Sequence, residues 1–163
     1  APMRPPVPTP ARLGTLVFGL VLLFCASAVA VQATRPEYDW WQAPLSFYLA
    51  GPNSAWLQAA YYGLALAPVL LSAALQRSLV ASARYILVPV LLVGGGLALA
   101  VTATWPGASP GYPASDAGAF IHGVSAIAAF LLVGTAPVGR HGYFGLRIVG
   151  QFPSFAGRQP ERQ

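Results

Sequence analysis

One carboxylate and one imidazole lie close together in the stretch WPGASPGYPASDAGAFIHG, residues 105–123, as Asp116 and His122. An acid that orients a histidine can support general acid–base or nucleophilic catalysis. In a helix, however, six residues separate two side chains by ~9 Å along the axis and by about 240° around it. We therefore expect no Asp–His dyad, and the sequence predicts no catalytic residue.

Each of these two residues has a structural interpretation of its own. Asp116 follows a proline-broken stretch and precedes an apolar run, so it is predicted to be a helix N-cap that accepts bonds from free backbone N–H groups. His122 shares a small, polar helix face with Ser125, with Gly118 and Ala129 one turn away on either side. An ionisable residue within a membrane helix usually faces the bundle interior or a wet cavity. His122 is thus either a hydrogen-bonded interior histidine or the main functional candidate, with Asp116 and Ser125 beside it.

No cofactor or metal site is predicted. The other histidine, His141, lies nineteen residues after His122, which is ~28 Å along a continuous helix and excludes ligation of one haem by both. No cluster of Cys, Asp or Glu accompanies His122, so a first-row metal lacks ligands. The glycines at 94–96 lie inside an apolar run rather than in a phosphate-binding motif.

Four apolar runs position these residues. The chain has 163 residues, of which 56% are hydrophobic and 8% charged, whereas soluble domains carry roughly 25% charged residues. A helix needs about 20 mostly apolar residues to cross a bilayer. The sequence predicts an all-α, polytopic membrane protein, a four-helix antiparallel transmembrane bundle. Its predicted parts are a disordered Pro-rich cytoplasmic tail (1–12), the spans 13–31, 56–75, 85–104 and 117–138, and a basic cytoplasmic or interfacial tail (139–163).

The distribution of charge predicts the orientation of the chain. All nine basic residues are arginine, and eight of them fall before the first span, between the second and third, or after the fourth. Arg35 lies on the other side, together with Glu37, Asp39 and Asp116. This is the positive-inside pattern of a bacterial inner-membrane protein with both termini cytoplasmic. The net charge of +5 is therefore topological, and no nucleic-acid partner is predicted.

Two features of the apolar runs predict packing. The single cysteine, Cys25, is expected to be a small buried hydrophobe. The three glycines Gly94, Gly95 and Gly96 form a seam that lets a neighbouring backbone approach closely. Such a seam favours contacts with other membrane subunits.

The stretch ATRPEYDWWQAPLSFYLAGPNSAW, residues 33–56, is too aromatic for a solvated linker and is predicted to lie in the membrane interface. Within it, APLSFYLAG is expected to form a short interfacial helix stopped by Gly51 and Pro52. The outer side holds all four tryptophans. They are either a membrane anchor or the wall of an outward-facing pocket, for which the candidates are Trp40, Trp41 and Trp105.

Two functions follow from these features. The first is a non-catalytic accessory or scaffolding subunit of a larger membrane assembly, with membrane lipids and other membrane protein subunits as partners. The alternative is a protein that binds or transports a lipid or small amphiphile in an outward-facing pocket. In that case the aromatic loop would be its lid, and Asp116 and His122 would lie at two depths below it.

The stretches WWQAPLSFYLAGPNSAW (40–56) and YPASDAGAFIHGVSA (112–126) resemble the domain-of-unknown-function 998 family of bacterial and archaeal membrane proteins. That family resembles the wider group of six-helix membrane proteins that includes Frag1 and DRAM. The resemblance implies further spans where this chain has its Gly- and Arg-rich end. The family pattern of an aromatic loop with Leu–Ser, a Pro–x–Asp turn and a His–Gly in the next helix maps onto Leu45, Ser46, Pro113, Asp116, His122 and Gly123.

Overall fold

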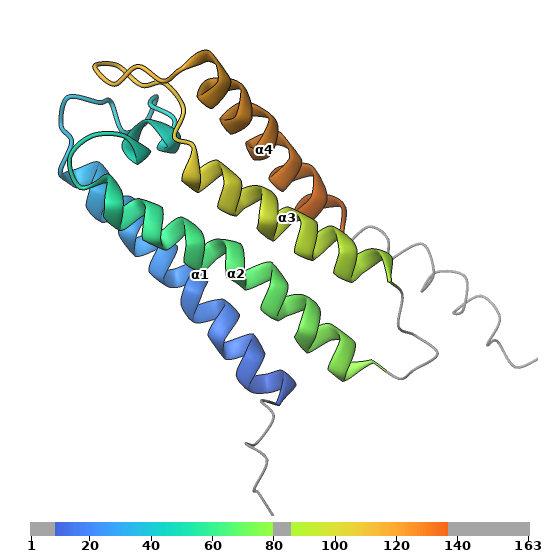
Figure 1. Ribbon diagram of the computed structural model, residues 1–163. Coiled ribbons are helices and arrows are strands. Elements are labelled where there is room, and N and C mark those ends of the chain that lie inside the picture. The colour runs from blue at the N-terminus through green and yellow to red at the C-terminus, as the bar shows by residue number, and fades with distance from the viewer. Residues whose placement is uncertain (1–8, 80–85, 137–163) are drawn as a thin grey trace, which may run out of the picture.

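The computed structural model describes residues 9–79 and 86–136, and in these the protein is all-helical. Four of the helices are long and apolar enough to cross a membrane, which confirms the predicted fold class. Figure 1 shows them lying side by side and alternating in direction along the chain. The elements are α1 (Pro10–Ala33), the 3-10 helix η1 (Leu45–Leu49), α2 (Ser54–Ser78), α3 (Leu87–Thr104) and α4 (Asp116–Thr135).

The predicted spans agree with the helices to within a few residues. α1 begins at Pro10 because Thr9 caps it, its side chain accepting a bond from the Arg12 backbone N–H, and because proline suits the first helical position. The last three residues of the predicted N-terminal tail are therefore helical. The predictions for residues 1–8, for the connection at 80–85 and for the chain from residue 137 onward lie outside the described residues.

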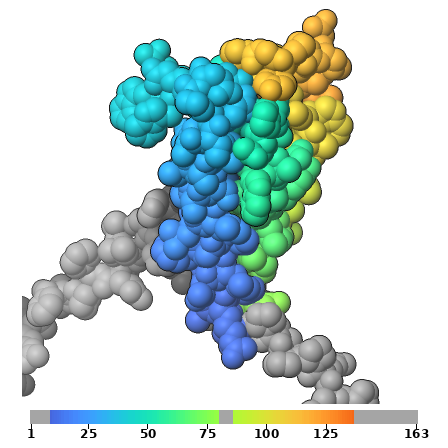
Figure 2. All heavy atoms as spheres, turned by 90° about the vertical axis from the view of Figure 1, so that its left-hand side faces the viewer, coloured from blue at the N-terminus to red at the C-terminus, as the bar shows by residue number. Residues whose placement is uncertain are grey.

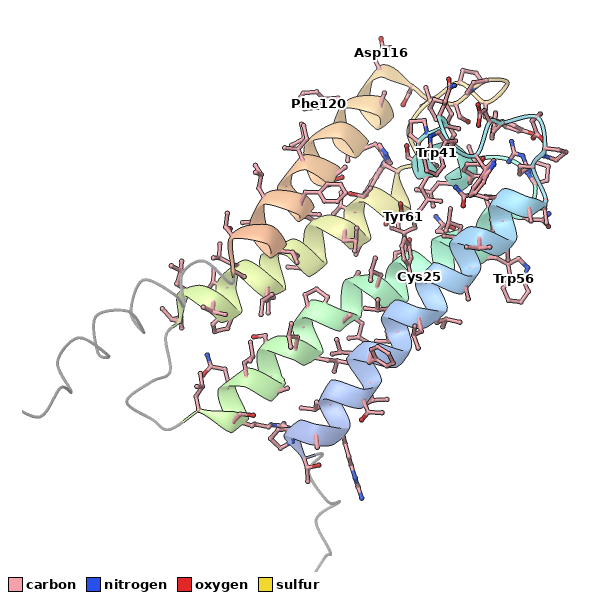
Figure 3. The ribbon with its side chains drawn as sticks, turned by 180° about the vertical axis from the view of Figure 1, so that it is seen from behind. Cys25, Trp41, Trp56, Tyr61, Asp116 and Phe120 are labelled. Atoms are coloured by element: carbon pink, nitrogen blue, oxygen red, sulfur yellow. The ribbon has the colours of Figure 1, made fainter. Side chains whose placement is uncertain are left out.

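The helices pack in chain order. α1 packs against α2, α2 against α3 and α3 against α4, whereas no comparable packing joins α1 to α4 within residues 9–79 and 86–136. An up-and-down bundle commonly closes by packing its first helix on its last. Here that side is open, and α2 and α3 form the floor of a groove between α1 and α4. Figure 3 looks into this groove from behind the view of Figure 1.

The glycine seam is used within the chain. A Cβ atom at Gly96 would lie 2.5 Å from the carbonyl oxygen of Ala65 in α2, and one at Gly95 would lie 2.5 Å from Cγ2 of Val133 in α4. Both neighbours are therefore closer than a larger residue permits. Gly95 and Gly96 therefore pack within the chain, against α4 and α2, and the expected contact to other subunits stays a prediction.

The prediction that Cys25 is buried is wrong. Its side chain is exposed, and of the residues of α1 only Leu13 and Val31 are buried. Among the described residues, helix α1 packs mainly on α2, with a smaller contact to η1, so most of its surface faces outward, as the space-filling view shows (Figure 2). In a membrane helix such a surface meets lipid or a partner, and Cys25 lies on it.

The two connections at residues 34–53 and 105–115 gather at one end of the bundle, which we call the loop end (Figure 1). The expected short helix is present as η1, whose Tyr48 and Leu49 pack with Val31 of α1 and Leu57 of α2 in a buried cluster. Gly51 follows it with φ +88°, and a Cβ there would lie 2.6 Å from Cζ of Tyr112. Only glycine suits this close approach and left-handed backbone, which confirms Gly51 as the stop.

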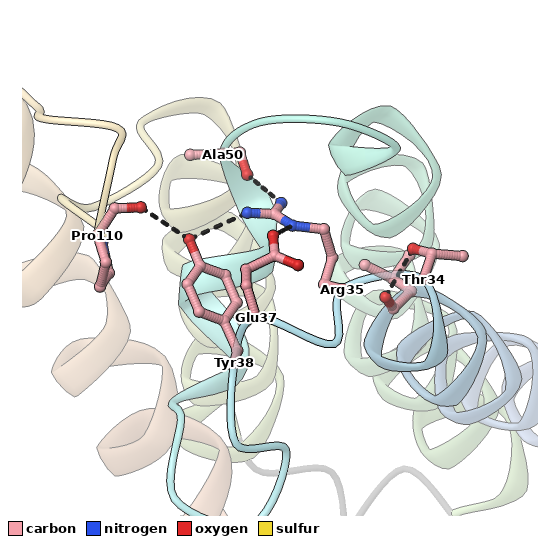
Figure 4. A network of polar contacts seen from close by, with 7 residues as sticks. Thr34, Arg35, Glu37, Tyr38, Ala50 and Pro110 are labelled. Carbon is pink, nitrogen blue, oxygen red and sulfur yellow. Dashed lines mark hydrogen bonds and ion pairs between the residues drawn. The ribbon is translucent and has the colours of Figure 1, made fainter.

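Arg35 ties the loop end together (Figure 4). Its side chain is buried and donates from Nη1 to the Ala50 carbonyl at 2.9 Å, from Nη2 to the Tyr38 hydroxyl at 3.0 Å, and from Nε to Glu37. The Tyr38 hydroxyl in turn donates to the Pro110 carbonyl at 2.9 Å. One buried cation thus joins the end of α1, the segment after η1 and, through Tyr38, the α3–α4 connection.

Electrostatics strengthen this arrangement. Burial lowers the pKa of Arg35, but the hydrogen bond and charge of Glu37 outweigh that effect and the pKa is raised. The same hydrogen bond holds the pKa of Glu37 below its ordinary value. Both groups are therefore ionised at neutral pH. In contrast, burial raises the pKa of Tyr48, which stays a neutral phenol.

Candidate functional site

A cavity of about 670 Å³ lies on the open side of the bundle, beside η1 and between α1 and α4. That volume is within the range of small-molecule sites, which runs from roughly 300 to 1,000 Å³. In Figure 3 the viewer faces this side, with Tyr61 near its centre. Its walls come from all four helices and from η1 with the proline before it: Phe24, Pro44, Leu45, Ser46, Tyr61, Leu64, Pro68, Leu99, Thr102, His122, Ala126, Ala129, Phe130, Val133 and Gly134.

His122 of α4 is held in one orientation by the end of α3. Its Nδ1 lies 2.9 Å from the Trp105 carbonyl oxygen and 3.3 Å from that of Thr102. Carbonyl oxygens only accept, so Nδ1 carries the hydrogen, and Nε2 of the neutral ring keeps its lone pair. The ring is therefore hydrogen-bonded inside the bundle, to backbone carbonyls at the end of α3. Within the described parts of the chain no group hydrogen-bonds to Nε2.

The small face around His122 joins α4 to α3. The hydroxyls of Ser125 and Thr102 lie 2.8 Å apart and are buried, and Ser125 also donates to the His122 carbonyl at 3.1 Å. Gly107 also lies close to the ring, because a Cβ atom at this position would be 3.0 Å from Cδ2 of His122. Ser125 therefore contributes to positioning the imidazole and does not line the cavity.

Two further polar side chains in the cavity wall have no hydrogen-bond partner among residues 9–79 and 86–136. They are Ser46 in η1 and Tyr61 in α2, and both are half-buried. The Tyr61 ring is fixed edge-on against Phe24 of α1, with ring centroids 5.0 Å apart. Sequence reasoning did not single out Tyr61, because a tyrosine in an apolar run gives no indication of which helix face is hollow. Ser46 was present in the family pattern but not among the site candidates.

The polar groups of the cavity lie at one of its ends. His122 and Tyr61 are each ~9–11 Å from the loop-end terminus of their helix, and Ser46 lies in the loop end itself. From His122 the wall continues along α4 through Ala126, Phe130 and Val133 to Gly134, a length of ~18 Å that offers no polar side chain. The cavity therefore has a polar end and an apolar shaft.

Asp116 is not part of this cavity. It is the first residue of α4 and is exposed, and Figure 3 shows it at the outer tip of the helix. The N-cap is Ser115, whose hydroxyl accepts from the Gly118 backbone N–H at 3.1 Å. The prediction of Asp116 as the cap is wrong by one residue. Serine and aspartate are equally good N-cap residues, so the residue type alone does not show which of the two neighbours precedes the first helical turn. Asp116 still adds a favourable negative charge to the first turn.

The tryptophans lie outside the cavity. The exposed fractions of Trp40, Trp41 and Trp105 are 65%, 83% and 43%, and none of the three lines the cavity. None of these three indoles therefore forms a wall of this cavity. Trp40 and Trp41 contact each other edge-on, with ring centroids 5.9 Å apart, in the segment between α1 and η1. Their position suits the alternative interpretation of an aromatic belt.

The structure brings together residues that the sequence keeps far apart. Leu45 and Ser46 of the aromatic stretch and His122 of the last helix line one cavity, whereas Pro113, Asp116 and Gly123 do not. Across residues 9–79 and 86–136, no three His, Cys, Asp or Glu side chains are grouped to hold a metal ion. The arrangement can bind and orient a molecule with a polar end and an apolar chain.

The four apolar helices define a multi-pass integral membrane protein. The sequence model of the family described as "Protein of unknown function (DUF998)" matches residues 18–157. The chain belongs to this family. Comparison with the curated proteins and with the solved structures finds no match.

Proposed function

We propose that the protein binds a membrane amphiphile in the cavity beside η1. The observation that carries this proposal is the division of the cavity into a polar end at Ser46, Tyr61 and His122 and an apolar shaft along α4. An amphiphile has the same division, so its head and chain each meet a matching surface. Burial of the chain in the shaft supplies affinity, and the few polar groups supply orientation.

The open side of the bundle supports entry from the bilayer. Because α1 and α4 do not pack together as the other neighbours do, a chain can enter sideways between them without separating any of the three packed pairs. With the loop end on the outer side, as the arginine distribution predicts, the head would lie near the outer membrane interface. The protein would then act on the outer leaflet of a bacterial inner membrane.

An accessory subunit is the second candidate, and the exposure of α1 favours it. Apolar side chains on its outer surface, including Phe18 and Val29, are 63% and 66% exposed. Lipid alone can cover such a surface, but so can a helix of another subunit. The glycine seam adds less support to this candidate, since Gly95 and Gly96 pack within the chain.

Gentle extraction followed by mass measurement of the intact protein distinguishes the two functions. Amphiphile binding predicts a monomer that retains one tightly bound lipid after extensive detergent exchange. A defined complex with other subunits, or with a second copy, that retains no lipid would contradict it. The bound molecule is then identified by fragmentation.

A further inference from the structure

We infer that the amphiphile has an uncharged head with a free hydroxyl group, as in a long-chain alcohol or a mono- or diacylglycerol. The inference rests on the proposed function and concerns the chemistry of its polar end. It follows from which hydrogen-bonding capacities the protein has left unused there. Those are the Nε2 atom of His122 and the hydroxyls of Ser46 and Tyr61.

The His122 ring is suited to a ligand that donates a hydrogen bond. Its Nδ1 hydrogen is already directed at the Trp105 carbonyl, so the neutral form of the ring keeps an acceptor, Nε2, on a residue that lines the cavity. A ligand hydroxyl donates to that lone pair, and its oxygen accepts from Ser46 or Tyr61, whose hydroxyls have no partner in the described residues. The ligand hydroxyl and the protein groups that contact it are then hydrogen-bonded, which matters because an unpaired buried polar group is costly.

A negatively charged head finds no counter-charge. Within residues 9–79 and 86–136, no lysine or arginine lines the cavity. The buried cation of the loop end, Arg35, is 2% exposed and directs Nε, Nη1 and Nη2 at Glu37, Ala50 and Tyr38. A phosphate or carboxylate would thus be desolvated without a lysine or arginine to pair it.

A positively charged head is disfavoured on the same ground. A cation entering an apolar site needs a carboxylate or a cage of aromatic faces. Among residues 9–79 and 86–136, no Asp or Glu lines the cavity, and Glu37 is paired with Arg35. The aromatic rings of the wall form no cage at the polar end, because Phe24 is engaged edge-on with Tyr61 and Phe130 lies ~12 Å further along α4 than His122. Of the three classes of head, the uncharged hydroxyl is the one for which the cavity offers matching hydrogen-bond partners.

Two substitutions of His122 separate ligand contact from structure. In His122→Asn the amide nitrogen is bonded to Cγ as Nδ1 is, so donation to the Trp105 carbonyl is kept while the acceptor at Nε2 is deleted. In His122→Gln the amide group is one bond further out and reaches the Nε2 position. We expect Asn to weaken binding of a hydroxyl ligand about threefold to tenfold, with Gln closer to the native protein.

The test uses the full chain in nanodiscs and a hexadecanol probe that carries a diazirine in its chain. Light-induced attachment is mapped by mass spectrometry, and four unlabelled sixteen-carbon competitors are compared: hexadecanol, hexadecanoate, hexadecyl phosphate and hexadecylammonium. We expect the probe to attach at Leu99, Ala126 or Phe130. Unlabelled hexadecanol should displace the probe at least about tenfold more effectively than the charged compounds do. His122→Asn should be labelled more weakly than the native protein. Ser46→Ala provides a second variant, with a similar weakening expected, should His122→Asn fail to fold.

Equal displacement by the charged competitors would overturn the inference while leaving the proposed function intact, because the cavity would then bind chains without selecting heads. Undiminished labelling of both folded His122→Asn and Ser46→Ala would also overturn it. Absence of attachment anywhere in the cavity would contradict the proposed function together with the inference.

Discussion

The contact of α3 with α2 at Gly96 allows a prediction whose size follows from the structure. An added Cβ at this position would lie 2.5 Å from the Ala65 carbonyl oxygen and 3.2 Å from side-chain atoms of Pro68 and Val69. The first distance is short of ordinary contact by about 0.9 Å, and the neighbour is backbone, which cannot rotate away. In Gly96→Ala the two helices must therefore separate, at a cost of roughly 1–3 kcal/mol in free energy of unfolding.

Gly94 supplies the matched control. It lies in the same helix two residues earlier, and its Cβ would meet only Cδ1 of Leu132 at 3.4 Å, which is at the edge of ordinary contact. Both substitutions gain the same helix propensity, about 1 kcal/mol, so the difference between them isolates the steric cost. Unfolding of the purified protein by increasing mole fractions of dodecyl sulfate, followed by circular dichroism, measures both. Equal stability of Gly94→Ala and Gly96→Ala would refute the close packing of α2 on α3.

Three further predictions concern the helix cap, the histidine and the ion pair. Ser115→Ala should lower the free energy of unfolding by about 0.5–2 kcal/mol and Asp116→Ala by less, because the Ser115 side chain is the N-cap of α4. A larger loss for Asp116→Ala in the same dodecyl sulfate titration would show that Asp116 is the cap instead. His122→Ala should cost roughly 1–3 kcal/mol, because the Trp105 carbonyl loses its donor, and His122→Asn should restore most of that loss; similar losses for both would argue against the Nδ1 bond. The pKa of Glu37 is lowered by the hydrogen bond from Arg35, so its stabilising contribution is complete above its ordinary pKa of 4.5 and is lost as the pH falls toward the folded-state pKa. Thermal unfolding at a series of pH values should therefore show a smaller loss of stability below pH 4.5 in Glu37→Gln than in the native protein, and parallel curves would count against the pair.

The apolar runs predicted the helices because a membrane span is defined by local composition and length. The four-helix class could therefore be derived from the sequence, and the spans approximately. Which face of each helix packs inside the bundle could not be derived from the sequence, because in a membrane both the packed and the lipid-facing surfaces are apolar. For this reason Cys25 was expected inside and lies outside, and the glycine seam was assigned to a partner although Gly95 and Gly96 pack against α4 and α2.

The candidate site was predicted in part. His122 could be inferred as a candidate with a hydrogen bond of its own, because a polar ring inside a membrane helix must pair. Which group pairs with it could not be read from the sequence. The cavity around it depends on η1 lying beside the groove and on α1 and α4 remaining apart, which are long-range arrangements with no local signal. Residue type alone left the tryptophans as either a membrane anchor or a pocket wall, and the structure leaves Trp40, Trp41 and Trp105 outside this cavity, with exposed fractions of 65%, 83% and 43%.

Blocking the cavity tests most directly whether it binds an amphiphile. Ala126 lines the shaft, and its neighbour Ile127 is 63% exposed on the outer surface of α4. Both variants place an indole on α4, but only Ala126→Trp puts it in the shaft. Mass measurement of the intact, gently extracted proteins should show that Ala126→Trp loses the retained lipid while Ile127→Trp keeps it at the native level, with equal helix content by circular dichroism. Full lipid retention by folded Ala126→Trp would contradict the assignment of this cavity as the binding site.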